Sequence, residues 1–243
     1  MAKGSISKYS PDPRVATVAT LMGDPGRASI LAALLGGLEL SAGELAEHAR
    51  LAPNAASAHL SKLVLGGLLH VRSQGRRRYF CLAGPEVARA MEALSVVAPP
   101  TRIVALAQAQ RADELRHART CYDHLAGWLG VAITDSLVLR GELLPIEPDE
   151  YEVTARGGSL FDSLAIDIDR LRRIRRRSAR QCLDWSERRP HLAGALGADL
   201  CRRFLEYGWV ERTPVGRAVR VTEPGRDWLL ERLGIEVAAP SIS

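Results

Sequence analysis

The stretch SAGELAEHARLAPNAASAHLSKLVL, residues 41–65, decides how the first part of the chain folds. Ser41 and Glu44 have the spacing of a capping box, which predicts that a short helix begins directly after Ser41. Pro53 favours the start of a second helix, because proline suits the first helical turn. Apolar residues repeat on one face of this second helix, at Ala56, Leu60 and Leu63. Two helices joined by so short a turn are typical of a helix-turn-helix.

The sequence on either side extends this motif. Helices are predicted over residues 15–22 and from Pro25 to the glycines at 36 and 37. Residues 68–72 and 77–82 are predicted to be two strands around a Gln74-Gly75 turn, and a helix is predicted over residues 86–95. A helix-turn-helix followed by such a hairpin predicts a winged helix, in which the hairpin is the wing.

The second helix has the width that the major groove of DNA accepts, and the hairpin carries positive charge beside it. Four positions of the helix are predicted to face bases or phosphates: Asn54, Ser57, Ala58 and Ser61. The hairpin contributes four basic candidates for phosphate contact: Arg72, Arg76, Arg77 and Arg78. No acidic residue lies between Val71 and Phe80. The other interpretation of these arginines is a solvated hairpin end.

The charge of the chain is unevenly distributed. The net charge is +5, and residues 1–100 hold 11 Lys and Arg against 7 Asp and Glu. Residues 101–243 hold 22 against 21. The basic excess therefore lies in the part that contains the helix-turn-helix, which favours a nucleic acid as its partner.

Residues 13–95 resemble the ArsR/SmtB family of bacterial repressors. The resemblance rests on Met22-Gly-Asp-Pro-Gly-Arg27, Glu44-Leu45-Ala46, Ser57-Ala-His59-Leu60-Ser-Lys-Leu63, Gly67-Leu68-Leu69 and Gly75-Arg76 with Tyr79. It implies a dimeric winged helix that binds an operator in double-stranded DNA and is released by an inducer, often a metal ion. It also places His59 and Lys62 on the recognition helix as candidate DNA contacts. The alternative for His59 is a partly buried helix residue.

The second half of the chain contains an internal repeat. Pro99-Pro100 predicts a boundary between a winged-helix domain, residues 1–98, and a sensor or regulatory domain, residues 99–243. The sequence His-Leu-Ala-Gly occurs at 124–127 and again at 191–194, each time after a Cys-x-Asp. We therefore expect two helix–hairpin–helix units, about residues 121–168 and 182–236, bridged by an arginine-rich helix over residues 169–180. The fold class expected for the whole chain is mainly α with small β-hairpins.

A candidate metal site lies in this second half. His117, Cys121 and His124 are four and three residues apart, so a helix would place them on one face. A thiolate and two imidazoles suit Zn²⁺ or another borderline-soft divalent ion, which is the candidate effector. Cys182 and His191 are the counterparts of Cys121 and His124 in the repeat and are additional candidates. The alternatives are a packing role for these residues and a redox switch of the thiols.

The metal sites familiar in the ArsR/SmtB family are absent. Residues 39–44 contain no Cys-x-Cys, and the helix at residues 86–95 contains no His and no Asp. A small organic effector is therefore the competing hypothesis, with a pocket lined by aromatic residues of the second half. These are Trp128, Trp185, Trp209, Trp228, Tyr122, Tyr207 and Phe161.

The sequence does not favour an enzyme. It contains no Gly-x-Ser-x-Gly, Walker loop, His-Glu-x-x-His or dinucleotide fingerprint, so we assign no catalytic residues. The least unfavourable enzyme would use Cys121 with His124 or His117 as nucleophile and base.

Composition and cysteine usage set the expected compartment. Apolar residues make up 47% and charged residues 25%, which is typical of a soluble globular protein. The four cysteines are too scattered for a disulfide scaffold, and the first residues lack the apolar segment of a signal peptide. We therefore expect a cytoplasmic protein with no membrane partner, and the effector stays unidentified.

Overall fold

The computed structural model describes residues 14–75, 77–99, 106–146, 148–174, 177–214 and 216–238. These residues form two compact units. The first contains the described residues up to 32 and residues 39–83, and the second contains residues 33–38 and the described residues from 84 onward. The expected domain boundary at residue 98 differs from this division, which places the helix after the wing in the second unit. No helix in the described ranges has the length and apolar character that crossing a membrane requires.

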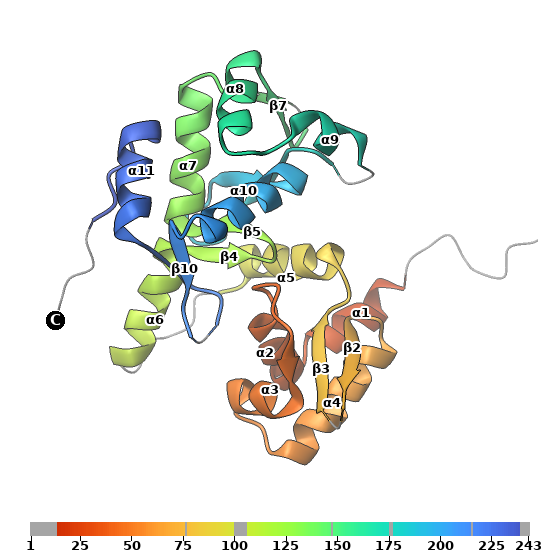
Figure 1. Ribbon diagram of the computed structural model, residues 1–243. Coiled ribbons are helices and arrows are strands. Elements are labelled where there is room, and N and C mark those ends of the chain that lie inside the picture. Colours follow the sequence, from red (N-terminus) through yellow and green to blue (C-terminus); the bar gives the residue numbers. More distant parts are fainter. Residues whose placement is uncertain are drawn as a thin grey trace, which may run out of the picture. The chain divides into compact units, whose positions relative to one another are not determined.

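The first unit has the element order of a winged helix (Figure 1). Its elements are α1 (Val15–Met22), α2 (Pro25–Ala33), β1 (Leu40–Ser41), α3 (Ala42–Ala49), α4 (Pro53–Leu65), β2 (Leu69–Gln74) and β3 (Arg77–Leu82). The three strands form an antiparallel sheet in the order β1-β3-β2. The short strand β1, which the sequence did not predict, pairs Leu40 with Phe80. The expected mixture of helices and small antiparallel hairpins is confirmed.

Local signals fix the turn between α3 and α4. The Ser41 amide donates to the Glu44 carboxylate over 2.7 Å, and the Glu44 amide donates to Ser41 Oγ over 3.4 Å. This is the predicted capping box. Arg50 ends α3 in the left-handed conformation, at a φ of 53°, and Pro53 occupies the first turn of α4. Three residues of α4 are buried in the unit: Ala56, Leu60 and Leu63.

The second unit contains the same order of elements twice. α5 (Pro85–Val97) and α6 (Leu106–His117) come first. The first segment comprises β4 (Arg119–Cys121), β5 (His124–Ala126), α7 (Gly127–Leu139), β6 (Leu143–Ile146), β7 (Glu150–Val153) and α8 (Ala155–Ser163). After α9 (Ile168–Arg173), the second comprises β8 (Arg180–Leu183), β9 (Pro190–Ala193), α10 (Gly194–Glu206), β10 (Val210–Arg212), β11 (Val219–Val221) and α11 (Glu223–Leu233). A common origin of the two segments stays a prediction.

Equivalent positions in the two segments have the same local structure. Gly127 and Gly194 begin α7 and α10 with φ values of +75° and +82°, where a side chain would be strained. Thr154 Oγ1 accepts a hydrogen bond from the Gly157 amide over 3.1 Å, and Thr222 Oγ1 accepts one from the Gly225 amide over 3.2 Å. The repeated glycines and threonines of the sequence therefore start equivalent helices.

Two predicted helices are corrected. The arginine-rich helix expected over residues 169–180 is limited to α9, which ends at Arg173, and Arg180 begins strand β8. The helix expected to carry His117, Cys121 and His124 ends at His117. Cys121 and His124 are paired across the β4–β5 hairpin, because Tyr122 turns the chain with a φ of 61°. A two-residue hairpin turn thus brings Cys121 and His124 together, and the same three-residue spacing would also suit one turn of a helix.

A buried ion pair connects the two segments of the second unit. Arg119 in β4 and Asp184 after β8 have fully buried side chains, with Arg119 Nη2 2.8 Å from Asp184 Oδ2. The same carboxylate oxygen accepts a hydrogen bond from the Gly127 amide over 2.7 Å. Its other oxygen accepts hydrogen bonds from the amide and hydroxyl of Ser186. The Arg119 guanidinium also lies 4.5 Å from the ring centroid of Trp185.

We expect Arg119→Met to lower the free energy of unfolding by about 3–5 kcal/mol, because it leaves a buried carboxylate without its main cation. Urea denaturation followed by circular dichroism measures this change. The matched control is Arg220→Met, which removes an exposed ion pair with Glu211 and is expected to have little effect. Equal urea midpoints for the two variants would contradict a structural role for the buried pair.

Candidate functional site

The exposed side of α4 is polar. Opposite its buried side, five of the six residues predicted from this helix as DNA contacts are exposed: Asn54, Ser57, Ala58, Ser61 and Lys62. The small side chains leave room for a base edge, and Ser61 Oγ donates to the Ser57 carbonyl over 2.9 Å. This face is therefore shaped for a groove and carries no acidic group.

His59 lies apart from this exposed face. Its side chain is 19% exposed, and its Nδ1 lies 3.5 Å from Asp24 Oδ1, just before α2. A Cβ added to Gly26 would lie 3.0 Å from His59 Nε2, so the imidazole packs closely against the start of that helix. The environment of His59 fits the alternative interpretation, a partly buried helix residue.

The arginines of the wing differ in their contacts. Arg77 and Arg78 on β3 are exposed, and the Arg78 guanidinium lies 5.9 Å from the Phe80 ring. Arg72 on β2 is also exposed but forms an ion pair with Glu39, with 2.5 Å between Nη2 and Oε2. Arg76 lies outside the described residues. Arg77 and Arg78 are therefore the better described candidates for phosphate contact, since Glu39 already neutralises Arg72.

A second candidate site lies in the second unit, where two hairpins bring four ligand-type side chains together. Cys121 pairs with His124 across β4–β5, and Cys182 pairs with His191 across β8–β9. One sulfur or nitrogen atom of each of these four residues lies within 4.8 Å of the other three. We call this set the Cys/His cluster. It contains both pairs that are equivalent in the sequence repeat.

His117, the third member of the predicted helical trio, is not part of the Cys/His cluster. Its ring stacks on Trp128, with 5.1 Å between the centroids and 13° between the planes. Burial lowers the pKa of His117. The structure therefore brings together the two additional candidates, Cys182 and His191, in place of His117.

Two glycines lie where each long helix packs on its own hairpin and on the histidine of the other segment. A Cβ added to Gly130 in α7 would lie 2.5 Å from the Leu125 carbonyl oxygen and 3.6 Å from His191 Cβ. At the equivalent Gly197 in α10, it would lie 2.5 Å from the Leu192 carbonyl oxygen and 3.2 Å from His124 Cβ. Each histidine thus packs on the helix of the other segment.

The two imidazoles of the cluster face each other. Their Nε2 atoms are 3.2 Å apart. His124 Nδ1 lies 3.2 Å from Asp123 Oδ1, and His191 Nδ1 lies 3.3 Å from Asp184 Oδ2. The Asp123 carboxylate favours a proton on His124 Nδ1, which leaves His124 Nε2 as an acceptor facing His191 Nε2.

The ionisable groups in and around the cluster shift one another's pKa values. A hydrogen bond from the Cys121 thiol lowers the pKa of Cys182 against the effect of burial, while the same contact and burial raise the pKa of Cys121. Burial disfavours the charged forms of both His191 and Asp184, but the electrostatic attraction between the two side chains has the larger effect on their pKa values. It raises the pKa of His191 to about 9 and, with Arg119, holds the pKa of Asp184 well below its usual value. The ionisation of the Cys121–Cys182 pair and that of the His191–Asp184 pair are therefore linked.

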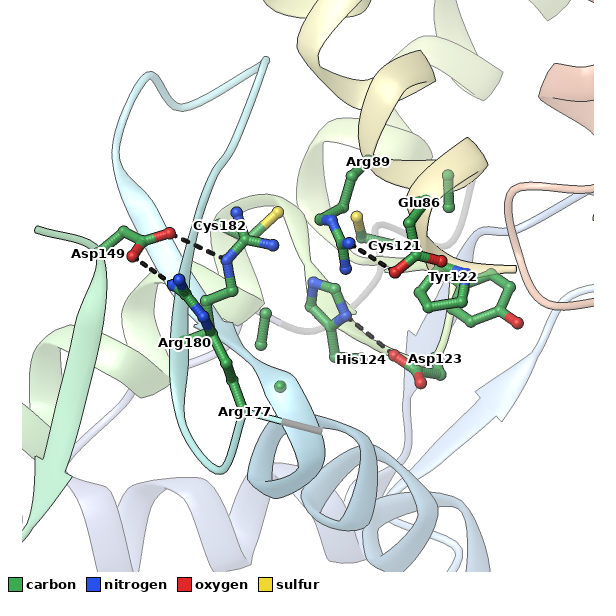
Figure 2. A pocket seen from close by; sticks show the side chains of 14 residues that line it. Glu86, Arg89, Cys121, Tyr122, Asp123, His124, Asp149, Arg177, Arg180 and Cys182 are labelled. Carbon is green, nitrogen blue, oxygen red and sulfur yellow. Dashed lines mark hydrogen bonds and ion pairs between the residues drawn. The ribbon is translucent and has the colours of Figure 1, made fainter. Parts of the chain in front are cut away.

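A pocket of about 740 Å³ opens beside the Cys/His cluster (Figure 2). Cys121, His124 and Cys182 contribute to its wall. Its charged lining residues are Glu86, Arg89, Asp123, Asp149, Arg177 and Arg180. Figure 2 shows Arg177 and Arg180 paired with Asp149, and Arg89 paired with Glu86. The pocket therefore carries charged side chains in its wall and gives solvent a path to the cluster.

The aromatic residues proposed to line an effector pocket are mostly part of the core. The Trp209 and Trp228 rings stack with 4.3 Å between centroids, and Phe204 lies edge-on to both. The Trp185 ring packs against the Arg119 guanidinium. Of the seven aromatic candidates, Tyr122 alone lines the pocket of Figure 2.

The two carboxylates behind the histidines were not predicted as site residues. The signal was present in the repeat, because Asp123 and Asp184 each stand two residues after a cluster cysteine, as Cys-x-Asp. Only the paired hairpins show that these carboxylates reach the imidazoles.

Comparison with known proteins identifies the class of the chain. Residues 22–72 match a family model described as a helix-turn-helix domain. YdfF, an uncharacterised HTH-type transcriptional regulator of Bacillus subtilis, is 42% identical over 226 residues. That match covers 93% of this chain and 100% of YdfF. The chain belongs to the HTH-type transcriptional regulators. The function class expected from its helix-turn-helix is thereby confirmed.

Solved structures similar to this HTH-type regulator cover its first part. HlyU from Vibrio cholerae is 31% identical and matches 34% of this chain and 89% of its own, with a TM-score of 0.32. The homodimeric winged helix-turn-helix domain of Mb0332 from Mycobacterium bovis, a possible ArsR-family regulator, is 35% identical. It matches 34% of this chain and 76% of its own, with a TM-score of 0.32. NolR from Sinorhizobium fredii is 28% identical over 40% of this chain and 100% of its own, with a TM-score of 0.34.

We expect Arg77→Ala with Arg78→Ala to weaken binding of this regulator to specific and random duplexes alike, because phosphates carry no sequence information. The slope of log affinity against log salt should fall by about 1 for each lost contact. Fluorescence anisotropy at several salt concentrations measures both quantities. Arg220→Ala with Arg232→Ala removes the same charge from exposed positions of the second unit and serves as the control. Identical slopes in the two double variants would exclude the wing from the interface.

Proposed function

We propose that this HTH-type regulator is a dimeric repressor that binds an operator through α4 and the wing, and that an effector bound in the second unit releases it. The observation that carries the proposal is the exposed polar face of α4 beside the arginines of β3. In the helix-turn-helix arrangement the second helix enters the major groove and the wing lies along the backbone. Repression then follows from occupation of the operator.

The dimer is supported by the exposed apolar surface of α1. Val15 is 67% exposed and Val18 is 38% exposed, and Met22 is the only residue of this helix that is buried. An apolar helix surface of this kind favours burial against another copy of the chain. Two copies would present two recognition helices to half-sites one helical turn of DNA apart, about 34 Å.

The location of the effector is supported by the pocket of Figure 2. It is a cavity with three side chains of the Cys/His cluster and six charged side chains in its wall. Such a combination is typical of a ligand site. The aromatic pocket of the alternative hypothesis has less support, since most of the candidate rings pack in the core.

Operator binding is tested by Ser57→Glu. We expect affinity for the DNA upstream of the regulator's own gene to fall at least about tenfold, because a carboxylate in the groove is repelled by phosphates and exceeds the space of a serine. An electrophoretic mobility shift assay measures the loss. The control is the same substitution at Ser159, which is exposed on α8 in the second unit. Unchanged affinity of a folded Ser57→Glu protein would mean that α4 does not enter the groove.

Dimer formation is tested by Val15→Glu with Val18→Glu. We expect the protein to sediment as a monomer, because two carboxylates would have to be buried in the interface. Analytical ultracentrifugation measures the mass. Leu139→Glu with Leu230→Glu changes two exposed leucines of the second unit in the same way and should leave the dimer intact. A dimeric α1 variant would place the interface elsewhere.

A further inference from the structure

The geometry of the Cys/His cluster is close to that of a tetrahedral metal site. Zn–S and Zn–N bonds of about 2.3 and 2.0 Å place the ligand atoms of a tetrahedral zinc site about 3.3–3.8 Å from one another. The four donor atoms here lie within 4.8 Å of one another. Closing on an ion therefore requires the separations between donor atoms to shorten by about 1.5 Å at most. The donors come in equal numbers from two hairpins, so an ion would join β4–β5 to β8–β9.

The orientation of the histidines favours a cation between them. His124 Nδ1 is hydrogen-bonded to Asp123 and His191 Nδ1 lies 3.3 Å from Asp184 Oδ2, and the two Nε2 atoms face each other 3.2 Å apart. Two ring nitrogens at this distance need a proton or a metal ion between them, because two lone pairs would repel. Carboxylates behind ligating imidazoles are the usual outer shell of zinc sites in proteins.

The donor set selects the class of metal. Two sulfurs and two imidazole nitrogens suit Zn²⁺, Cd²⁺ and Co²⁺, whereas Mg²⁺ and Ca²⁺ require oxygen ligands. The two nearby carboxylates, Asp123 and Asp184, are occupied by the imidazoles. His124 and Cys121 are buried but also border the pocket, which provides an entry path for an ion.

We propose that Cys121, His124, Cys182 and His191 bind one divalent ion of the zinc class, and that this ion is the effector that releases the regulator from DNA. The binding site stands on the cluster alone, while the role as effector rests on the proposed function. The pocket beside the site is also bordered by Glu86 and Arg89 of α5. α5 begins three residues after the last residue of the wing strand β3, so it directly follows the DNA-binding unit in the chain.

A redox switch is the competing explanation. Oxidation would join the Cys121 and Cys182 sulfurs in a disulfide, with two electrons and two protons passing to an oxidant. That reaction involves two of the four side chains and does not explain why two imidazoles face each other with a carboxylate near each of them. The metal site uses all four groups, which is why we favour it.

Metal binding is tested on the full-length, reduced and chelator-treated protein by titration with Co²⁺ and then Zn²⁺. We expect one Co²⁺ per chain, with the absorption of tetrahedral cobalt and of thiolate-to-cobalt charge transfer, and its displacement by Zn²⁺. Cys182→Ser should reduce affinity at least about 100-fold, since it removes a ligand. Asp123→Asn retains all four ligands and should lower the affinity for Co²⁺ about 10- to 100-fold, as is usual when an outer-shell partner is lost.

Cys201→Ser is the matched control, because Cys201 is a buried cysteine of α10 outside the cluster. It should bind Co²⁺ like the wild type, with the same spectrum. In the wild type, Zn²⁺ should protect the partly exposed Cys182 from iodoacetamide, as read by peptide mass spectrometry, which does not depend on any variant folding. Absence of a tetrahedral spectrum in the reduced wild type, or wild-type affinity in Cys182→Ser, would overturn the site.

The effector role is tested with the same protein and the DNA upstream of its own gene. We expect stoichiometric Zn²⁺ to lower DNA affinity at least tenfold in the wild type and Cys201→Ser, and to leave Cys182→Ser bound. Metal binding without a change in DNA affinity would overturn the effector role while retaining the site. Failure of the metal-free wild type to bind any DNA would contradict the proposed function, and the cobalt titration would still decide the site.

Discussion

The buried carboxylate of Asp184 is the group on which the second unit depends. A charge with no solvent access is stable in a protein only when its hydrogen bonds are satisfied and a cation lies beside it. Asp184 meets this condition with groups from both segments: the Arg119 guanidinium and the Gly127 amide from the first, and Ser186 from its own. It therefore fixes β4 and the start of α7 against β8, and it contacts the His191 ring from the same position.

This arrangement determines the chemistry of the Cys/His cluster. Asp123 is hydrogen-bonded to the His124 ring and Asp184 lies 3.3 Å from the His191 ring, so rotation of either imidazole would separate it from its carboxylate. The cluster without an ion must then place a proton between nitrogens and share a hydrogen bond between Cys121 and Cys182. A divalent ion would replace these protons and draw the four atoms together. With an ion bound, the two hairpins would lie closer together, and such a difference in contacts is what a ligand needs to shift an equilibrium.

The sequence was sufficient for the winged helix because its signals are local. The capping box at Ser41, the proline at 53 and the apolar face of α4 each act within one or two turns of helix. The site in the second unit depends on pairing between distant residues, and there the sequence was ambiguous. The spacing of Cys121 and His124 suits both one helical turn and a two-residue hairpin, and the left-handed Tyr122 decides for the hairpin. The repeat identified Cys182 and His191 as equivalents, but only packing shows that they are partners.

The repeat also explains why a site can form where each copy alone could not provide one. A single Cys–His hairpin offers two ligands, and a tetrahedral ion needs four. Each histidine packs on the helix of the other segment, and a Cβ added at Gly197 would lie 3.2 Å from His124 Cβ, closer than ordinary van der Waals contact. The repeated Cys-x-Asp and His-Leu-Ala-Gly motif therefore serves two purposes. It packs the two segments together, and it supplies the ligands of the proposed site.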